Sequence, residues 1–140
     1  MSDLDSEAKN PADVVEGYLS ALEQGDFDTA YMLLADDVVF HNVGLPVLRG
    51  RDRTVGLFRK MMRWIRFEAV IDHIAVEGSC VLTLRRDVMI LGPLRLRFWV
   101  WGIFEVREGR IALWREYFDY FAMFRTTWRA VAGLVIPSLR

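Results

Sequence analysis

FEAVIDHIAV (67–76), VLTLRRDVMIL (81–91), LRLRFWVWGIFEV (94–106) and RIALWREYFDYF (110–121) are the stretches that decide the fold of this chain. Each is rich in β-branched, aromatic and other apolar residues, which favour strands. The turns that separate them, which contain EGS, GP and REG, are only two to four residues long. Consecutive strands joined so closely are antiparallel neighbours, because a parallel pair needs a much longer crossover. The sequence therefore predicts a meander of four long strands.

Helical patterns lie on both sides of this meander. Asn10 and Pro11 form a helix start, and Gly25 ends the apolar periodicity that follows. A second short helix is expected from Asp26 to residue 34, a strand at VVFHNV (38–43), and a third helix from Asp52 to about residue 65. Helical spacing returns at 121–136. Helices followed by a meander predict an α+β fold, with a curved sheet and helices on one of its faces.

Length and composition limit the possible functions. A chain of 140 residues fits one domain, 1–140, whose acidic and polar first nine residues are expected to form a flexible leader. The net charge of −1 argues against a nucleic-acid binder. One cysteine and two histidines exclude a Cys-rich zinc site, and we expect no metal. Without a signal sequence or a transmembrane run, the expected compartment is the cytoplasm.

The alternation of side chains along the strands bears on assembly. In 94–106, Leu96, Phe98, Val100 and Phe104 share one face, yet the other face carries Trp99, Trp101 and Ile103. A sheet with one wet face would alternate more cleanly between apolar and polar residues. We therefore expect helices to cover one face and a second copy of the chain to cover the other, which predicts a homodimer formed through the sheet.

A few charged residues stand within these apolar strands. Arg85 and Asp87 are two apart, so they project from the same face of their strand. On a wet face they would form an ordinary surface ion pair, and in a cavity they would form a desolvated, titrating site. Glu116 shares a face with Trp114 and Phe118, so its carboxyl either reaches a rim or has a raised pKa. Asn42, disfavoured in a strand, is expected to hydrogen-bond something specific.

These residues lie within a recognisable order of segments. VVFHNVGLP with RGRD, then LTLRRDVMILGP, then FWVWGIFEVREGRIALWREYFD resembles the limonene-1,2-epoxide hydrolase family, in particular its mycobacterial-type members. The resemblance covers about residues 11–121. It implies the NTF2-like (SnoaL-like) cone, in which three N-terminal helices pack on the concave face of a curved, mostly antiparallel sheet, here followed by a short C-terminal helix at 121–136.

The resemblance also implies a mechanism without metal or organic cofactor. Family members open an epoxide to a vicinal diol in one general acid/base step, with no covalent intermediate. By position, Asp87 resembles the acid, Arg85 the bridge between the two acids, and Asn42 a water ligand. Glu116 stands where the family usually has the base Asp, and Phe40 where it has a Tyr. These two departures displace one carboxylate and remove one anchor of the water.

The same resemblance outlines a substrate pocket and a small apolar epoxide as its ligand. An apolar lining suits a terpenoid, fatty or steroid-like epoxide. The expected lining residues are Phe40, Phe58, Met62, Met89, Phe98, Val100, Trp114 and Phe118. Beyond the pocket, the stripe of Phe121, Phe124 and Trp128 either closes its mouth or packs on the sheet or dimer, whereas Arg125 and Arg129 would also suit an anionic membrane surface.

Two other functions remain open from the sequence. A ketosteroid-isomerase-like enzyme would use a carboxylate base in the same kind of cone, but it needs an oxyanion donor where this chain has Phe40. A lipophile-binding module without chemistry is favoured by the same two departures, Phe40 and Glu116. Consumption of an epoxide distinguishes a hydrolase from both.

Overall fold

The computed structural model describes residues 10–136, and helix α2 (Pro11–Gln24) begins this part of the chain. The Asn10 side chain caps it by accepting a 2.9 Å hydrogen bond from the Ala12 N–H. Gly25 ends it in the left-handed conformation, at φ 72°. Both signals were read from the sequence and are confirmed. The leader expected at 1–9 lies outside the described residues.

The next elements differ from expectation at their boundaries. After α3 (Phe27–Met32), strand β1 (Leu34–Asn42) begins at Leu34, which had been assigned to the helix. Leu34 is drawn into the sheet because it pairs with Ile111, whose N–H donates to the Leu33 carbonyl at 2.8 Å. The two-residue strand β2 (Leu48–Arg49) was not anticipated at all.

Helix α4 (Arg51–Met61) ends about four residues earlier than the sequence suggested. Strand β3 (Arg66–Glu77) already pairs with β4 at Arg66, so the chain must leave the helix and turn before that point. The apolar residues at 62 and 65 therefore lie in the turn between α4 and β3 rather than on the helix. Sheet pairing outweighs local helical periodicity here.

The predicted meander is confirmed. Strands β3, β4 (Cys80–Leu91), β5 (Leu94–Arg107) and β6 (Arg110–Phe118) pair antiparallel in sequence order. The full order is β2-β1-β6-β5-β4-β3, and only the β1–β6 pair is parallel. Helix α5 (Tyr120–Val135) follows β6 and packs on β5. None of the helices in the described part is long and apolar enough to cross a membrane.

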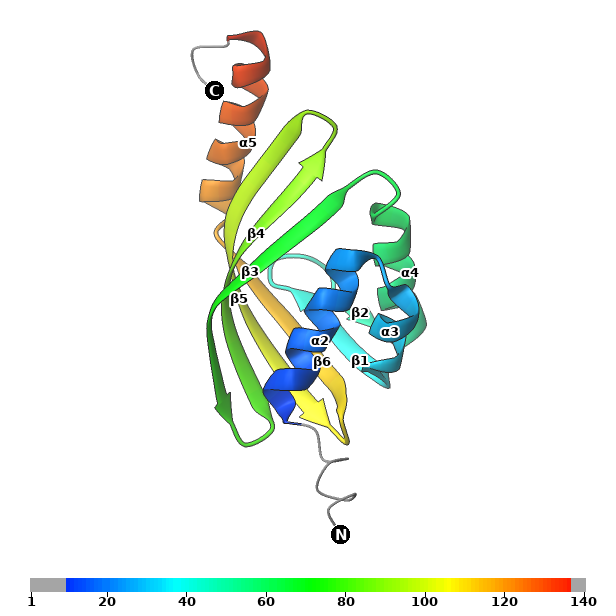
Figure 1. Ribbon diagram of the computed structural model, residues 1–140. Coiled ribbons are helices and arrows are strands. Elements are labelled where there is room, and N and C mark those ends of the chain that lie inside the picture. Colours follow the sequence, from blue (N-terminus) through cyan, green and yellow to red (C-terminus); the bar gives the residue numbers. More distant parts are fainter. Residues whose placement is uncertain (1–9, 137–140) are drawn as a thin grey trace.

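The sheet curves around the three N-terminal helices (Figure 1), as expected for the cone. Helix α2 crosses the concave face and contacts β3 to β6, α4 lies against β1 and β2, and α3 joins α2 to α4. The core between them buries Tyr18 and Leu22 of α2 against Phe104 and Trp114 of the sheet. Side chains thereby fill the space between α2 and this part of the sheet.

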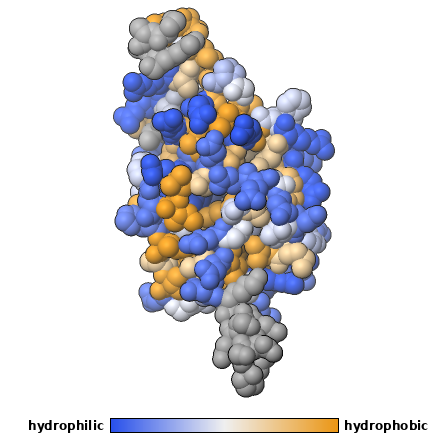
Figure 2. Space-filling model, in the orientation of Figure 1, coloured by the Kyte–Doolittle hydropathy of each residue, from blue (hydrophilic) through white to orange (hydrophobic). Residues whose placement is uncertain are grey.

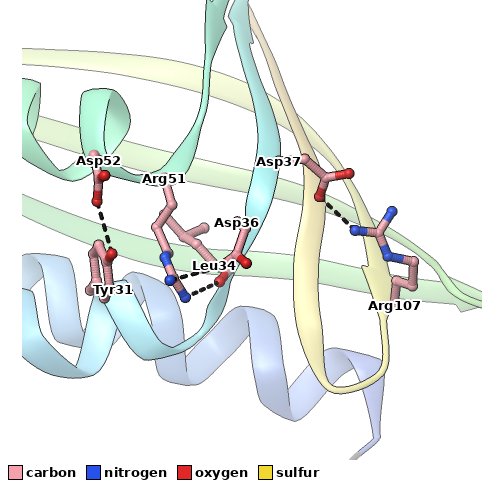
Figure 3. Close-up of polar contacts among 7 residues, drawn as sticks. All are labelled: Tyr31, Leu34, Asp36, Asp37, Arg51, Asp52 and Arg107. Atoms are coloured by element: carbon pink, nitrogen blue, oxygen red, sulfur yellow. Dashed lines mark hydrogen bonds and ion pairs between the residues drawn. The ribbon is translucent and has the colours of Figure 1, made fainter.

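Polar contacts tie the helices to the edge of the sheet (Figure 3). Arg51, the first residue of α4, lies 2.6 Å from a carboxylate oxygen of Asp36 in β1. The Tyr31 hydroxyl donates to Asp52 at 2.8 Å and so joins α3 to α4. At the far end of β5, Arg107 lies 2.6 Å from a second carboxylate of β1. Exposed pairs of this kind add about 0–1 kcal/mol each, so they orient the elements more than they stabilise them.

Candidate active site

Arg85 lies between two carboxyl groups in the interior of the cone. Its Nε and Nη2 donate to the Asp87 carboxylate at 3.2 and 2.8 Å, a bidentate pair. The same Nη2 lies 3.0 and 2.9 Å from the two carboxylate oxygens of Glu116. Arg85 is fully buried, and Asp87 and Glu116 are 1% and 4% exposed. The Arg85–Asp87 pair is therefore the desolvated site and not the surface ion pair.

The strand register explains how three strands bring these groups together. Arg85 and Asp87 are two residues apart and both lie on the concave face of β4. Glu116 of β6 pairs with Gly102 of β5, which in turn pairs with Thr83 of β4. The Arg85 side chain thus reaches along its strand and across β5 to meet Glu116. Because the residue in the middle of this path is a glycine, the sheet surface under the guanidinium is open.

Gly102 is the close approach that this arrangement requires. A Cβ at this position would lie 2.7 Å from Thr83 Oγ1, 2.9 Å from Phe104 Cε1 and 3.3 Å from Arg85 Nη1. The first two distances are shorter than van der Waals contact, so any larger residue would displace the floor on which Arg85 rests. Gly102 was not singled out from the sequence, where a glycine inside a long strand was the available signal.

Burial and charge set opposing demands on the carboxyl of Glu116. Burial raises the pKa of Glu116 above its ordinary value, the charge of Arg85 opposes that rise, and the nearby Asp87 adds to it. Burial also disfavours the charged form of Arg85, but Glu116 and Asp87 together raise the pKa of this guanidinium well above its usual range. Arg85 therefore stays charged, and the pKa of Glu116 is raised mainly by burial.

Asn42 stands beside Glu116 in the parallel β1–β6 pairing. Its Oδ1 is buried and has no hydrogen-bond partner among the described residues. Both side chains line the same cavity. A buried amide oxygen left without a partner is costly unless a ligand or water supplies one, so this corner of the cavity is suited to a small polar molecule.

The cavity next to the three charged groups has a volume of about 200 Å³. Its lining is apolar except for Asn42, Asp87 and Glu116. Seven of the eight expected lining residues are present: Phe40, Phe58, Met62, Met89, Phe98, Trp114 and Phe118. The rings of Phe40, Phe58 and Trp114 pack against one another, with ring centroids 4.1 to 5.5 Å apart. The further lining residues are Leu22, Leu45, Leu57, Met61, Ile65 and Phe67.

One expected lining residue does not line the cavity. Val100 is fully buried between its strand partners Arg85 and Phe118 and is not among the residues that line the cavity. Phe121, Phe124 and Trp128 are strongly exposed in the single chain, so they neither cover the mouth of the cavity nor pack on their own sheet. Packing of this stripe on a second copy stays a prediction.

Two buried hydroxyls near the charged groups were missed in the sequence. The Tyr18 hydroxyl, on α2, lies close enough to Glu116 and Arg85 for their charges to act on it, and burial raises the pKa of Tyr18 well above its ordinary value. Thr83 lies two residues before Arg85 on the same face of β4. Strand alternation could have identified Thr83, whereas only the packing of α2 on the sheet brings Tyr18 to the site.

No metal cluster is present in the described part of the chain, since no three His, Cys, Asp or Glu side chains there gather as metal ligands would. The arrangement instead offers two carboxyls held 3 Å from one guanidinium, beside an apolar cavity with one open amide. Such a pair can give a proton on one side and take one on the other.

A curved sheet with helices on its concave face and a cavity between them is the architecture of an NTF2-like protein. An NTF2-like protein of unknown function from Cytophaga hutchinsonii shares the fold, with a TM-score of 0.68 at 20% identity over 82% of this chain and 95% of that chain. At this identity the likeness concerns the fold alone, because NTF2-like proteins, like other widespread folds, host unrelated activities.

The particular family follows from closer matches. The limonene-1,2-epoxide hydrolase catalytic domain matches residues 9–129, and the chain belongs to this family. It is 49% identical over 126 residues to the epoxide hydrolase EphG of Mycobacterium tuberculosis, covering 90% of this chain and 85% of that relative. The solved structure of an M. tuberculosis LEH-like epoxide hydrolase superposes with a TM-score of 0.86 at 47% identity, over 91% of this chain and 96% of that chain. The family predicted from the sequence is confirmed.

Proposed function

We propose that this protein is an epoxide hydrolase that adds water to an apolar epoxide and releases a vicinal diol. The observation that carries the proposal is the buried Arg85, which holds Asp87 and Glu116 together beside an apolar cavity. Membership in the limonene-1,2-epoxide hydrolase family supports it, as does the relative named an epoxide hydrolase.

The proposed step uses one proton shared by the two carboxyls. Asp87, which has the position of the acid in the family pattern, donates a proton to the epoxide oxygen as its C–O bond breaks. A water held by Asn42 and ionised Glu116 attacks the carbon from the other side, and its proton passes to Glu116. The proton count of the pair is unchanged, and the site is reset when the proton moves back to Asp87. Arg85 orients both carboxyls and stays charged throughout.

The raised pKa of Glu116 makes it a better general base than a carboxylate with an ordinary pKa would be. A general base is most effective when its pKa approaches the working pH, and burial moves the pKa of Glu116 in that direction. The neighbouring Asn42 oxygen, buried and open to a ligand, supports the placing of water on the Glu116 side. Phe40 offers no hydroxyl there, so the water is held by one side chain fewer than in the family pattern.

The size of the cavity favours a compact substrate. Its volume of about 200 Å³ is below the range of about 300–1,000 Å³ that is usual for ligand pockets. A terpenoid-sized epoxide fits this scale better than a steroid-like one. Leu45 and Leu57 line the cavity and are 54% and 40% exposed, so they form its rim and would have to move for a longer fatty or steroid-like epoxide.

The test is diol formation in ¹⁸O-labelled water, with limonene oxide, a fatty-acid epoxide and a sterol epoxide as substrates. We expect label in the diol from the first turnover, because water and not a protein oxygen attacks. Asp87→Asn and Glu116→Gln should each abolish turnover, while Glu77→Gln, an exposed carboxyl remote from the cavity, should leave it unchanged. Binding of diols without turnover of any epoxide would favour the lipophile-binding module instead.

We further propose that two copies pair through the outer face of the sheet, in the cytoplasm. Leu82, Trp99, Trp101 and Tyr117 are exposed on this face in the single chain. Trp and Tyr are the residues most often found at the centres of protein interfaces. Light scattering of the purified protein should give a dimer, and Trp101→Glu should give a monomer.

A further inference from the structure

Helix α5 carries its apolar stripe on the side that faces away from the protein. Phe121, Phe124 and Trp128 are 75%, 71% and 70% exposed, and Val131 and Val135 continue the stripe in exposed positions. These five residues are three or four apart, so they form one face of the helix. Exposed patches of large apolar residues on a soluble domain mark a surface that another body covers.

The opposite side of α5 is the one that packs on its own sheet. A groove between α5 and the start of β5 is lined by Arg95 and Arg97 from the strand and by Thr126, Arg129, Ala130 and Gly133 from the helix. Arg95 and Arg97 alternate with Phe98, which lines the catalytic cavity, so α5 lies on the outer face of the sheet. The apolar stripe therefore takes no part in holding the fold together.

Positively charged side chains lie along one side of this stripe. Arg125 and Arg129 are exposed on α5, and no acidic residue occurs between Tyr120 and Val135. Arg95 and Arg97 add two further charges on the strand beneath, with Glu68 3.7 Å from Arg95 as an opposing group. The whole chain has a net charge of −1, so the basic residues are gathered in this region and do not reflect an excess of positive charge in the chain. A partner that fits here is negatively charged and accepts aromatic side chains.

The connection between α4 and β3 lies in the upper half of Figure 1, as α5 does, with the β4–β5 hairpin between the two. Trp64 in this connection is 78% exposed, and Arg63 and Arg66 beside it are exposed too. The next residues along the chain, Ile65 and Phe67, line the catalytic cavity. Figure 2 shows strongly hydrophobic and strongly hydrophilic side chains next to one another at this end.

A second copy of α5 fits the stripe less well. The 3-4-3-4 spacing from Phe121 to Val135 resembles a coiled-coil seam, but it spans only two heptads, and short helices of this length pair weakly. Opposite charges beside the seam often favour pairing in a coiled coil. Here Arg125 and Arg129 would meet only their own copies, because α5 has no acidic residue to offer.

We propose that α5 docks on an anionic lipid surface. Phe121, Phe124 and Trp128 enter the boundary between headgroups and acyl chains, and Arg125 and Arg129 lie against the negative headgroups, as in other interfacial helices. The docking itself is independent of the proposed hydrolase activity.

The experiment is co-sedimentation of the full-length protein with vesicles. One set of vesicles contains only phosphatidylcholine and the other contains equal parts of phosphatidylcholine and phosphatidylglycerol. We expect binding to the anionic set alone, and its loss at about 1 M salt, where the Debye length is about 3 Å. Absence of binding, or equal binding to both sets, would overturn the proposal.

Two paired variants assign the binding to α5. Arg125→Gln with Arg129→Gln should weaken it about 30-fold, since each basic residue near a charged surface contributes about fivefold. Phe124→Ser with Trp128→Ser should weaken it about 100-fold or more. Arg110→Gln and Met32→Ser, exposed residues elsewhere in the fold, are the matched controls and should bind normally. Conversion of a dimer to a monomer by the aromatic pair would instead make the stripe an interface between copies and refute lipid docking.

Discussion

Shortening Glu116 to aspartate tests whether this site is fitted to the longer side chain. The family usually has aspartate at this position, so resemblance alone expects Glu116→Asp to be harmless or beneficial. The structure leads to the opposite expectation, because the present carboxylate already lies 2.9–3.0 Å from Arg85 Nη2. The strands β4, β5 and β6 thus place Arg85 at a distance from the backbone of residue 116 that suits the length of a glutamate side chain.

The magnitude follows from the length that is lost. Removing one methylene withdraws the carboxylate by roughly 1.3 Å, given a C–C bond of about 1.5 Å. The contact with Nη2 would then exceed about 4 Å, beyond hydrogen-bond range. A hydrogen bond to a charged group contributes about 1.5–3 kcal/mol, which for a chain of this size lowers Tm by roughly 5–9 °C. A displacement of about 1 Å at the reacting atoms lowers kcat/KM about 100-fold.

The assay compares kcat/KM for an epoxide that the wild-type protein hydrolyses, together with Tm. Glu116→Gln is the companion variant, because it keeps the length, removes the base and should be inactive. Glu77→Asp makes the same change at an exposed position and should alter neither quantity. If Glu116→Asp were as active as wild type, the strands would adapt to either length, and the reasoning from the Arg85 distances would be refuted.

Three further predictions concern the close packing at Gly102, the raised pKa of Glu116 and the exposed leucine at the rim of the cavity. Gly102→Ala should lower both Tm and kcat/KM, because its Cβ would lie 2.7 Å from Thr83 Oγ1 and overpacking of this kind costs about 1–3 kcal/mol. Thr83→Ala in the same background should restore part of both quantities. If Gly102→Ala changed neither quantity, the close packing under Arg85 would be contradicted. Since burial raises the pKa of Glu116, the native state holds its proton more tightly than the unfolded state. The free energy of unfolding should therefore fall as pH rises above about 4.3 toward the raised pKa, and urea titrations of Glu116→Gln should lack this part of the slope. Leu57→Ala at the rim should lower KM for long-chain epoxides more than for limonene oxide, and an equal effect on both would argue that the rim does not limit size.

Much of the architecture could be predicted from local patterns. The cap at Asn10, the stop at Gly25 and the four strands of the meander depend on side-chain chemistry within a few residues, which a sequence displays directly. The boundaries that were wrong depend on partners far along the chain. Leu34 leaves its helix because Ile111 pairs with it, and α4 stops at Met61 because the next strand must start.

The candidate site divides in the same way. Strand alternation placed Arg85 and Asp87 on one face, and Glu116 and Asn42 could be matched to the family by position. The sequence around Arg85 and Asp87 could not show whether the pair is exposed to solvent or buried, because two residues at i and i+2 of a strand have the same spacing on either face. The contribution of Tyr18 was also hidden, because it comes from a helix that only folding brings against the sheet.

The sequence by itself determined the class of fold, the family and the identity of the chemical groups, because each is written in short-range periodicity or in motifs. Only the tertiary structure decided that Arg85 contacts both carboxyls at once, that Gly102 makes room for it, and that the cavity holds about 200 Å³. It also decided that the stripe on α5 faces outward. These features depend on the register and burial of segments that are distant in sequence, and such relations exist only once the chain has closed into the cone.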